Sequence, residues 1–486
     1  MSMDSIRKKT ISGFLWMFAE KVGAQVISFV VSIVLARILM PEEYGIMSIV
    51  FVIINLCDVL VENGFCKALI QNKDTDEQDY SSAFWGGLVI SLLLYVSLFF
   101  AAPAIGRFYR MELLSPIIRV MGLRGVLAAY GSVLKARVSR EMAFRKFFLS
   151  SLGGTLLSAV VGIAMAYMGF GVWALVAQNM VDAVVDTLVL AVTIRWYPKF
   201  VFSLRRVKRL LDYGWKVLVG SLVDTLYDNF RSLHIGRIYT ADDLAFYTRG
   251  RQFPNFLTEN ISFSISSVLF PAVASQREDK SEAKALTRRT MKTSAYVVTP
   301  VLCGLAAVAE PLVALVLTEK WLPCVPYLQI LCIYYALDPL HVVNIQVTYA
   351  CGRSDICLKL NVVKRIFGVL LIMISSRISV EAVAWAEAIF GLFSLLISAL
   401  PNRKLIGYRL LEQLRDVIPC WVLSGGMVIC VRMAGMLSLP VFSQLVLMVL
   451  TGIVSYILLS LVFRMESFFY LWKLLGSFLK KRNEKQ

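Results

Sequence analysis

Long apolar runs separated by short polar segments dominate the chain from about residue 11 to residue 463. Most runs are about 18–25 residues long, and a helix of that length spans roughly 30 Å of hydrocarbon. Lysine and arginine interrupt the runs at 115–134 and 360–376, which are the least regular. The pattern predicts an all-α integral membrane protein with about 14 transmembrane helices, at 11–36, 45–66, 82–106, 115–134, 148–167, 172–194, 213–237, 254–275, 293–317, 324–350, 360–376, 382–401, 417–431 and 441–463.

Basic residues concentrate in alternate connecting segments. The connections on the other side are short and often acidic, as in Pro41-Glu42-Glu43-Tyr44-Gly45, and the longest of them is predicted at 238–253. This alternation follows the positive-inside rule and places both termini in the cytoplasm, with a bacterial inner membrane as the predicted location. The basic segments are 7–9, 135–146, 205–209, 277–292, 403–415 and 480–482.

Composition supports a membrane protein over a soluble one. Hydrophobic residues make up 58% of the chain, charged residues 17%, and the mean hydropathy is +0.69. A soluble chain of this length needs a more charged surface. The net charge is +17, and the basic residues lie between the apolar runs. We therefore attribute them to the orientation of membrane insertion and to contact with anionic lipids, and we expect no nucleic-acid partner.

An internal repeat appears at an offset of 200 residues. Arg37-Ile38-Leu39-Met40-Pro41-Glu42-Glu43 aligns with Arg237-Ile238-Tyr239-Thr240-Ala241-Asp242-Asp243, and each stretch lies between two predicted helices on the outside. Six helices separate them, so both halves share one orientation, as in transporters built from parallel repeats. We predict two six-helix lobes around a central cavity, at 1–200 and 201–401, then two helices at 402–463 and a basic amphipathic cytoplasmic tail at 464–486.

Signatures of enzymes and cofactor sites are missing from the sequence. No Gly-Lys dipeptide occurs, which excludes a Walker A phosphate loop. His234 and His341 are the only histidines, and the nine cysteines are scattered without a Cys-x-x-Cys pair. We therefore predict a protein that is not an enzyme and has no cofactor, metal site or disulfide framework.

The candidate functional residues are polar side chains within apolar runs. A charge at mid-bilayer costs about 2.5–3.5 kcal/mol, so such residues usually face a bundle interior or a wet cavity. Cations there can bind a diphosphate or acidic sugar, and carboxylates can bind a coupling ion. The substrate-binding candidates are Lys21, Gln25, Arg119, Arg124, Lys216, Asp224, Asp228, Arg231, Lys364 and Arg365, and the coupling-ion candidates, for H⁺ or Na⁺, are Asp58, Glu62, Asp338 and His341.

Structural roles are the alternatives for these side chains. Lysines and arginines near the ends of predicted helices can extend to lipid headgroups, and this alternative applies to Lys21, Arg124, Lys216, Lys364 and Arg365. Asp224, Asp228 and Arg231 can form one ion-pair cluster that joins helices, and His341 can be a hydrogen-bonded packing residue. Asp338 precedes Pro339, which predicts a kink or a gate in that helix.

The sequence resembles the polysaccharide flippases of the multidrug/oligosaccharidyl-lipid/polysaccharide exporter superfamily, whose multidrug branch is MATE-like. The resemblance is closest to the lipopolysaccharide and teichuronic acid exporters, covers residues 10–400, and rests on several short segments in the expected order. They are Leu35-Ala36-Arg37-Ile38-Leu39-Met40-Pro41-Glu42-Glu43-Tyr44-Gly45, Glu62-Asn63-Gly64-Phe65, Ala68-Leu69-Ile70-Gln71, Gly169-Phe170-Gly171-Val172-Trp173-Ala174-Leu175-Val176, Ile235-Gly236-Arg237, Leu269-Phe270-Pro271-Ala272 and Gly352-Arg353-Ser354-Asp355.

This resemblance implies a two-lobe transporter that alternates between inward-open and outward-open states. The implied cargo is an undecaprenyl-diphosphate-linked oligosaccharide, flipped to the outer leaflet for surface polysaccharide biosynthesis, with membrane lipids and the polysaccharide polymerase machinery as further partners. A multidrug or small-cation antiporter on the same fold is the first alternative. A membrane polysaccharide polymerase or ligase is the second, although the short outside loops offer little room for a catalytic site.

Overall fold

The computed structural model describes residues 16, 23–72, 75–141, 143–276 and 279–473. These residues form helices and connections, with no strand in the ranges just given. The chain divides into two compact units, residues 1–245 (unit 1) and 246–486 (unit 2). The all-helical fold predicted from the apolar runs is confirmed. The two units are defined by how the chain packs in space, whereas the predicted lobes are defined by a repeat in the sequence. The lobe boundaries therefore stay a prediction.

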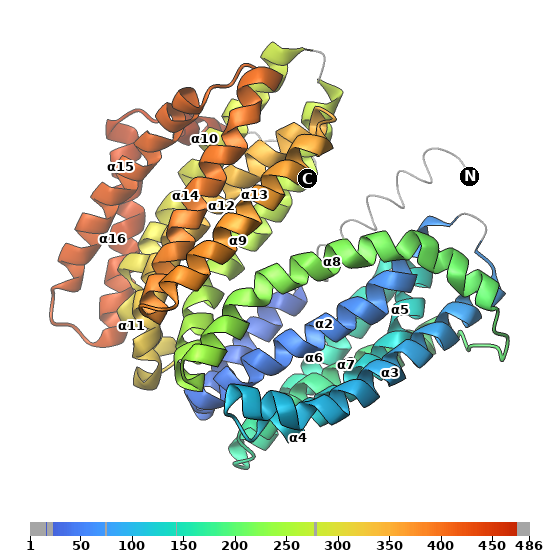
Figure 1. Ribbon diagram of the computed structural model, residues 1–486. Helices are drawn as coiled ribbons and strands as arrows, with labels where there is room; N and C mark the ends of the chain where they lie inside the picture. The colour runs from blue at the N-terminus through green and yellow to red at the C-terminus, as the bar shows by residue number, and fades with distance from the viewer. Residues whose placement is uncertain (1–15, 17–22, 73–74, 142, 277–278, 474–486) are drawn as a thin grey trace, which may run out of the picture. The chain divides into compact units, whose positions relative to one another are not determined.

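Unit 1 is a bundle of long helices, drawn from blue to green in Figure 1. Helix α2 packs against α5 and α8, and α6 packs along α7. The helices of this unit are Gly23–Ile38, α2 (Pro41–Gln71), α3 (Glu77–Tyr109), α4 (Leu114–Met121), α5 (Leu123–Glu141), α6 (Phe144–Tyr167), α7 (Val172–Ile194) and α8 (Leu204–Ile238).

Unit 2 begins within α9 (Ala241–Ser275), whose first turn belongs to unit 1. Helix α12 packs against α10 and α14, while α15 lies against both α10 and α16. The two helices predicted to follow the repeat are therefore packed into this unit. Its other elements are α10 (Lys280–Ala307), α11 (Ala309–Val316), η1 (Glu319–Cys324), α12 (Val325–Ala350), α13 (Ser354–Ser375), α14 (Val380–Leu405), α15 (Leu410–Gly435) and α16 (Val441–Val462).

Ten of the described helices are long and apolar enough to cross a membrane. Helices α10 and α11 add an eleventh span if the pair, bent by 68°, crosses as one. Helices α8 and α13 contain more charged residues and do not meet the same criterion. The predicted first span, 11–36, lies partly outside the described residues. The protein is a multi-pass membrane protein, and the count of fourteen spans stays a prediction.

Helix ends differ from the prediction mainly at the connections. Residues 41–45 were expected to form an outside turn but are the first turn of α2, because Pro41 occupies a helix-starting position that needs no amide donor. The predicted loop at 238–253 is also wrong: α9 starts at Ala241, so the connection is only Tyr239 and Thr240. Helix α12 continues through Pro339 as one uninterrupted helix.

The two repeat-related connections use the same capping interaction. The Glu43 carboxylate accepts a hydrogen bond from the Met40 amide at 2.7 Å, and Asp243 accepts one from the Thr240 amide at 3.2 Å. An acid at the third helical position satisfies a free amide at the helix start. Gly45 lies so close to the Ala241 carbonyl that a Cβ atom at Gly45 would overlap it. The two connections are thus in direct contact within unit 1.

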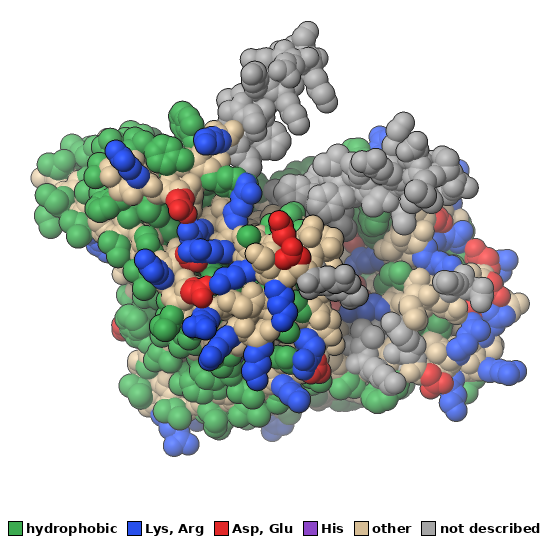
Figure 2. Space-filling model, turned by 90° about the horizontal axis from the view of Figure 1, so that it is seen from above, with side chains coloured by type: hydrophobic (Ala, Val, Ile, Leu, Met, Phe, Trp, Pro, Cys, Tyr) green, Lys and Arg blue, Asp and Glu red, His purple; other side chains and the backbone are tan. Residues whose placement is uncertain are grey.

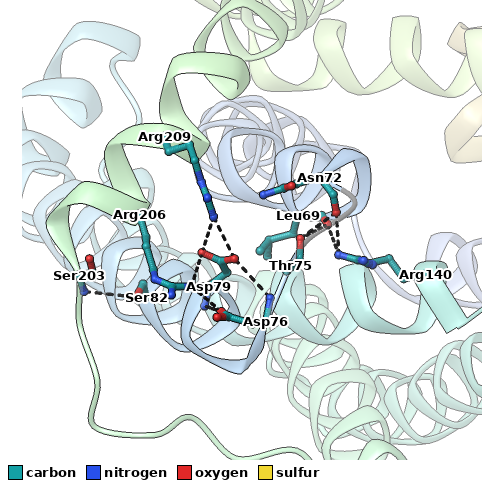
Figure 3. A network of polar contacts seen from close by, with 10 residues as sticks. All are labelled: Leu69, Asn72, Thr75, Asp76, Asp79, Ser82, Arg140, Ser203, Arg206 and Arg209. Carbon is teal, nitrogen blue, oxygen red and sulfur yellow. Dashed lines mark hydrogen bonds and ion pairs between the residues drawn. The ribbon is translucent and has the colours of Figure 1, made fainter.

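A buried carboxylate joins α8 to the start of α3 (Figure 3). Asp79, whose side chain is fully buried, accepts hydrogen bonds from Arg209 at 2.9 and 3.0 Å and lies 3.1 Å from Arg206. Asp76 accepts a further bond from Arg206 at 2.6 Å. The preceding connection is held as well, since the Ser203 amide donates to Ser82 at 3.3 Å. Part of the basic segment 205–209 is therefore neutralised by α3.

Candidate functional site

Unit 1 contains a cluster of charged residues inside three apolar helices. Arg124 on α5 lies 3.5 Å from Asp58 on α2, and Lys135 on α5 donates to Glu62 on α2 at 3.1 Å. Helix α7 adds Asp182, within electrostatic range of both cations, and Asp186, within range of Lys135. The cluster therefore holds two bases and four carboxyl groups. An excess of carboxyl groups suits a cation better than an anion.

This arrangement changes the role expected for Arg124. The residue was predicted to bind an anionic substrate, but its guanidinium group lies beside the Asp58 carboxylate. Asp58 and Glu62, both predicted as coupling-ion ligands, are brought together on one stretch of α2 and share the neighbouring cations of α5. The structure thus joins candidates from both predicted classes into one group.

Other candidates of unit 1 lie apart from this cluster. Arg119 on α4 packs over the Phe99 ring at 4.4 Å and donates to the Phe99 carbonyl at 3.3 Å. On α8, Arg231 is 6% exposed, whereas Asp224 and Asp228 are exposed. Gln25 is half-buried, and its side-chain oxygen has no hydrogen-bond partner among the described residues. Lys21 and the Lys216 side chain lie outside what the structure describes.

Unit 2 contains a chain of polar contacts across four helices. Lys364 on α13 lies 3.3 Å from Nε2 of His341 on α12, and His341 Nδ1 lies 2.8 Å from the Ser398 hydroxyl on α14. On the same helix as His341, Asp338 accepts a bond from Ser262 of α9 at 3.1 Å. Lys364 and Asp338 are within electrostatic range of each other. One sequence-predicted cation and two coupling-ion candidates therefore converge here.

Lys364 is only 6% exposed, which disfavours the alternative that it extends to the headgroups. Its contact with His341 agrees with a hydrogen-bonded packing role for that histidine, and equally with a site that holds a mobile proton. The neighbouring Arg365 is half-buried. A buried ammonium group is costly unless it is solvated or paired, and the contact with His341 and the nearby Asp338 provide polar surroundings for Lys364.

Sequence reasoning missed a second polar group of unit 2, on the first turns of α9. Arg251 donates to the Tyr335 hydroxyl at 2.8 Å, and Tyr247 donates to Glu387 at 2.6 Å. Glu387 is 2% exposed. These residues escaped notice because 238–253 was expected to be an outside loop. The clustered arginines of Arg249-Gly250-Arg251 beside Pro254 carried no apolar signal that would have extended the helix.

A family model described as "Polysaccharide biosynthesis protein" matches residues 34–326, more than half of the chain. The chain belongs to this family. The matched region includes all of α2 to α11 and therefore the complete charged cluster of unit 1. It ends at the start of α12, so Lys364, Asp338 and His341 lie beyond it.

Relatives of this polysaccharide biosynthesis protein include a transport protein and a teichuronic acid biosynthesis protein. The chain is 26% identical to the succinoglycan biosynthesis transport protein ExoT of Rhizobium meliloti (strain 1021) over 328 residues, which are 67% of this chain and 66% of ExoT, just under two thirds of its length. It is 27% identical over 409 residues to the teichuronic acid biosynthesis protein TuaB of Bacillus subtilis (strain 168), with 84% of each chain covered.

The fold of this family member also matches a solved structure. The lipid II flippase MurJ in an inward closed conformation superposes with a TM-score of 0.76 at 13% identity, over 92% of this chain and 98% of MurJ. At that identity the likeness concerns the fold alone. It confirms the all-helical fold that the resemblance implied, here shared with MurJ.

Proposed function

We propose that the protein flips an undecaprenyl-diphosphate-linked oligosaccharide from the cytoplasmic to the outer leaflet of a bacterial inner membrane by alternating access. The observation that carries this proposal is the partly buried charged cluster among apolar helices of unit 1, together with the buried Lys364 beside His341 in unit 2, in a polysaccharide biosynthesis protein. A hydrated glycan needs a polar path, because burying its hydroxyl groups unpaired in hydrocarbon is costly. The names of ExoT and MurJ, a transport protein and a flippase, support the same activity.

The two clusters suit different tasks. The carboxyl-rich group of unit 1, centred on Asp58 and Glu62, is suited to H⁺ or Na⁺, and we assign it the coupling ion. The buried Lys364 of unit 2 is suited to the diphosphate of the cargo, with Asp338 and His341 tuning its charge. The positive-inside rule supports a cytoplasmic position for both termini and for the basic segments. The polysaccharide polymerase machinery is the proposed recipient of the flipped product.

Transport in proteoliposomes tests the proposal. A fluorescent lipid-linked oligosaccharide is supplied in the outer leaflet, and its movement inward is followed by protection from a membrane-impermeant quencher. Lys364→Met should slow flipping by about tenfold or more, since it removes a buried charge worth at least one charge-assisted hydrogen bond. Lys359→Met on the same helix is the matched control, because Lys359 is exposed, and it should leave the rate unchanged.

Each alternative function gives a distinct result. Efflux of a cationic dye without glycan movement would replace the proposal by a multidrug antiporter. A change in glycan length would replace it by a polymerase or ligase. Equal flipping by wild type and Lys364→Met would remove Lys364 from the substrate path. A rate that responds to a pH or Na⁺ gradient, and loses that response in Asp58→Asn, would support the role assigned to unit 1.

A further inference from the structure

A basic pocket in unit 2 has no part in the transport path proposed above. It has a volume of about 510 Å³ and lies between α10 and the helical residues 466–473 that follow α16. One wall carries four cations of α10, spaced so that they share one side of the helix. The other wall carries Glu466, Ser467 and Tyr470. The four cations are Lys284, Arg288, Arg289 and Lys292.

Carboxylates of this unit neutralise part of that charge. Asp416 binds Arg288 through two bonds of 2.7 Å and lies 3.5 Å from Lys292. Glu466 accepts from Lys292 at 2.7 Å, and Lys284 lies 2.6 Å from Glu412. These pairs hold α15 and residues 466–473 against α10, and they fix the cationic wall in place.

Positive charge remains after these pairs are formed. A second hollow of about 420 Å³ shares Arg288, Lys292, Glu466 and Ser467 with the first and adds Arg415 and Arg464. Six cations thus face three carboxylates around the two hollows. Within the described ranges Arg415 and Arg464 form no ion pair, and both are exposed. Arg289 stacks on the Tyr470 ring at 3.7 Å, which leaves the edge of its guanidinium group open to an acceptor.

The pocket lies where a membrane surface would be. Residues 466–473 directly follow the apolar span α16, and Met465, Phe468 and Leu471 pack on the core of unit 2. Phe469 and Trp472 are 44% and 68% exposed, as aromatic residues at a bilayer interface often are. Figure 2 shows lysine and arginine side chains gathered on one face of the molecule and bordered by hydrophobic ones.

We propose that this pocket binds the phosphate headgroup of an anionic glycerophospholipid and thereby holds residues 466–473 on α10. Arg289, Arg415 and Arg464 offer donors to the phosphate oxygens, and basic pockets between transmembrane helices bind acidic lipids in this way. The exposed Phe469 and Trp472 favour a lipid over a free phosphate, because acyl chains can cover them. The site is separate from the cargo and holds whether or not the protein flips glycans.

Lipid titration of the full-length protein tests this site. The purified protein in neutral detergent is mixed with dioleoyl phosphatidylglycerol or dioleoyl phosphatidylcholine, and bound lipid is counted by native mass spectrometry. Phosphatidylglycerol should bind at least about tenfold more tightly than phosphatidylcholine. Arg289→Gln combined with Arg464→Gln should abolish that preference. Neither arginine forms an ion pair among the described residues, so the melting temperature in phosphatidylcholine should fall only by the small contribution of the Arg289–Tyr470 contact. Lys359→Gln, outside the pocket, should retain it.

Competition separates the possible sources of phosphate. Inorganic pyrophosphate at millimolar concentration should not displace the lipid. Displacement by pyrophosphate, or equal binding of both lipids, overturns the proposal, as does a double variant that keeps the preference. Arg415→Gln with Arg464→Gln is the second variant, and it should show the same loss. The flipping assay is read separately, so absence of transport leaves this lipid result unaffected.

Discussion

Asp79→Asn should weaken unit 1 more than any exposed charge change near it. The substitution keeps the size and one acceptor oxygen, but it removes the charge that Arg206 and Arg209 share. Asp79 is also the third helical residue of α3 and accepts a bond from the Asp76 amide at 3.3 Å. The change therefore affects the attachment of α8 and the start of α3 together.

The magnitude follows from burial. Removing one partner from a fully buried ion pair costs about 3–5 kcal/mol. Here the arginine side chains are 30% and 56% exposed and can regain water, so we expect a loss of about 2–3 kcal/mol, close to one hydrogen bond to a charged group. For a unit of this size that corresponds to a melting temperature lower by about 4–12 °C.

Asp76 provides the matched control. Its side chain is 50% exposed, so Asp76→Asn should cost less than about 1 kcal/mol. The hydrogen bond from Arg206 lowers the pKa of Asp76 below its ordinary value of 3.8. The Asp76–Arg206 pair therefore contributes its full stabilisation of the folded protein above about pH 4. This stabilisation is lost only as the pH falls through the lowered pKa of Asp76 in the folded state.

Thermal unfolding in detergent, followed by tryptophan fluorescence at pH 7, measures both variants. A melting temperature for Asp79→Asn that falls no further than that of Asp76→Asn would refute the reasoning from burial. A double-mutant cycle with Arg209→Gln should show positive coupling between Asp79 and Arg209, as expected for residues in direct contact.

Two other substitutions test the packing of the units. Gly45→Ala should destabilise unit 1 by about 1–3 kcal/mol, because the new methyl group overlaps the Ala241 carbonyl. Gly220→Ala is the control: its methyl group meets no atom within 4 Å, so this change should be neutral or stabilising. Thermal unfolding measures both variants. Asp416→Asn should loosen α15 from α10, because Asp416 binds Arg288 of α10 and also accepts a hydrogen bond from the Tyr408 hydroxyl at 2.8 Å. Limited proteolysis of the 406–409 connection should then become faster. Unchanged cleavage would contradict this role.

The helices themselves were largely predictable from the apolar runs. Segment 172–194 was predicted with the ends that α7 has, because Gly171 and Arg195 bound a largely apolar stretch that only a few polar side chains interrupt. The connections between helices were not predictable in the same way. Proline and acidic residues indicate a turn and a helix start equally well, as at Pro41. Hydropathy also did not predict that α9 begins twelve residues before Phe253, because the polar first turns of that helix are buried against protein.

Charged side chains within apolar runs could be singled out as candidates from the sequence, but their partners could not. The cost of burying a charge identified Asp58, Glu62, Arg124 and Lys364 without neighbours. Which of them meet depends on the rotation of each helix and on contacts between helices far apart in sequence, as between Lys135 and Glu62. Helical spacing within one run contains no such information. The same limit explains why the basic pocket between α10 and residues 466–473 was not predicted.

The buried amides that connect α12, α14 and α15 have a consequence for biosynthesis. Asn344 donates to Gln413 at 2.9 Å, and Asn402 donates to Asn344 at 2.6 Å, all three side chains being buried. Until residue 413 has been synthesised and inserted, Asn344 and Asn402 lack one member of this set. A chain truncated before α15 should leave these amides without Gln413, and we expect it to be degraded faster by membrane proteases than the full-length chain.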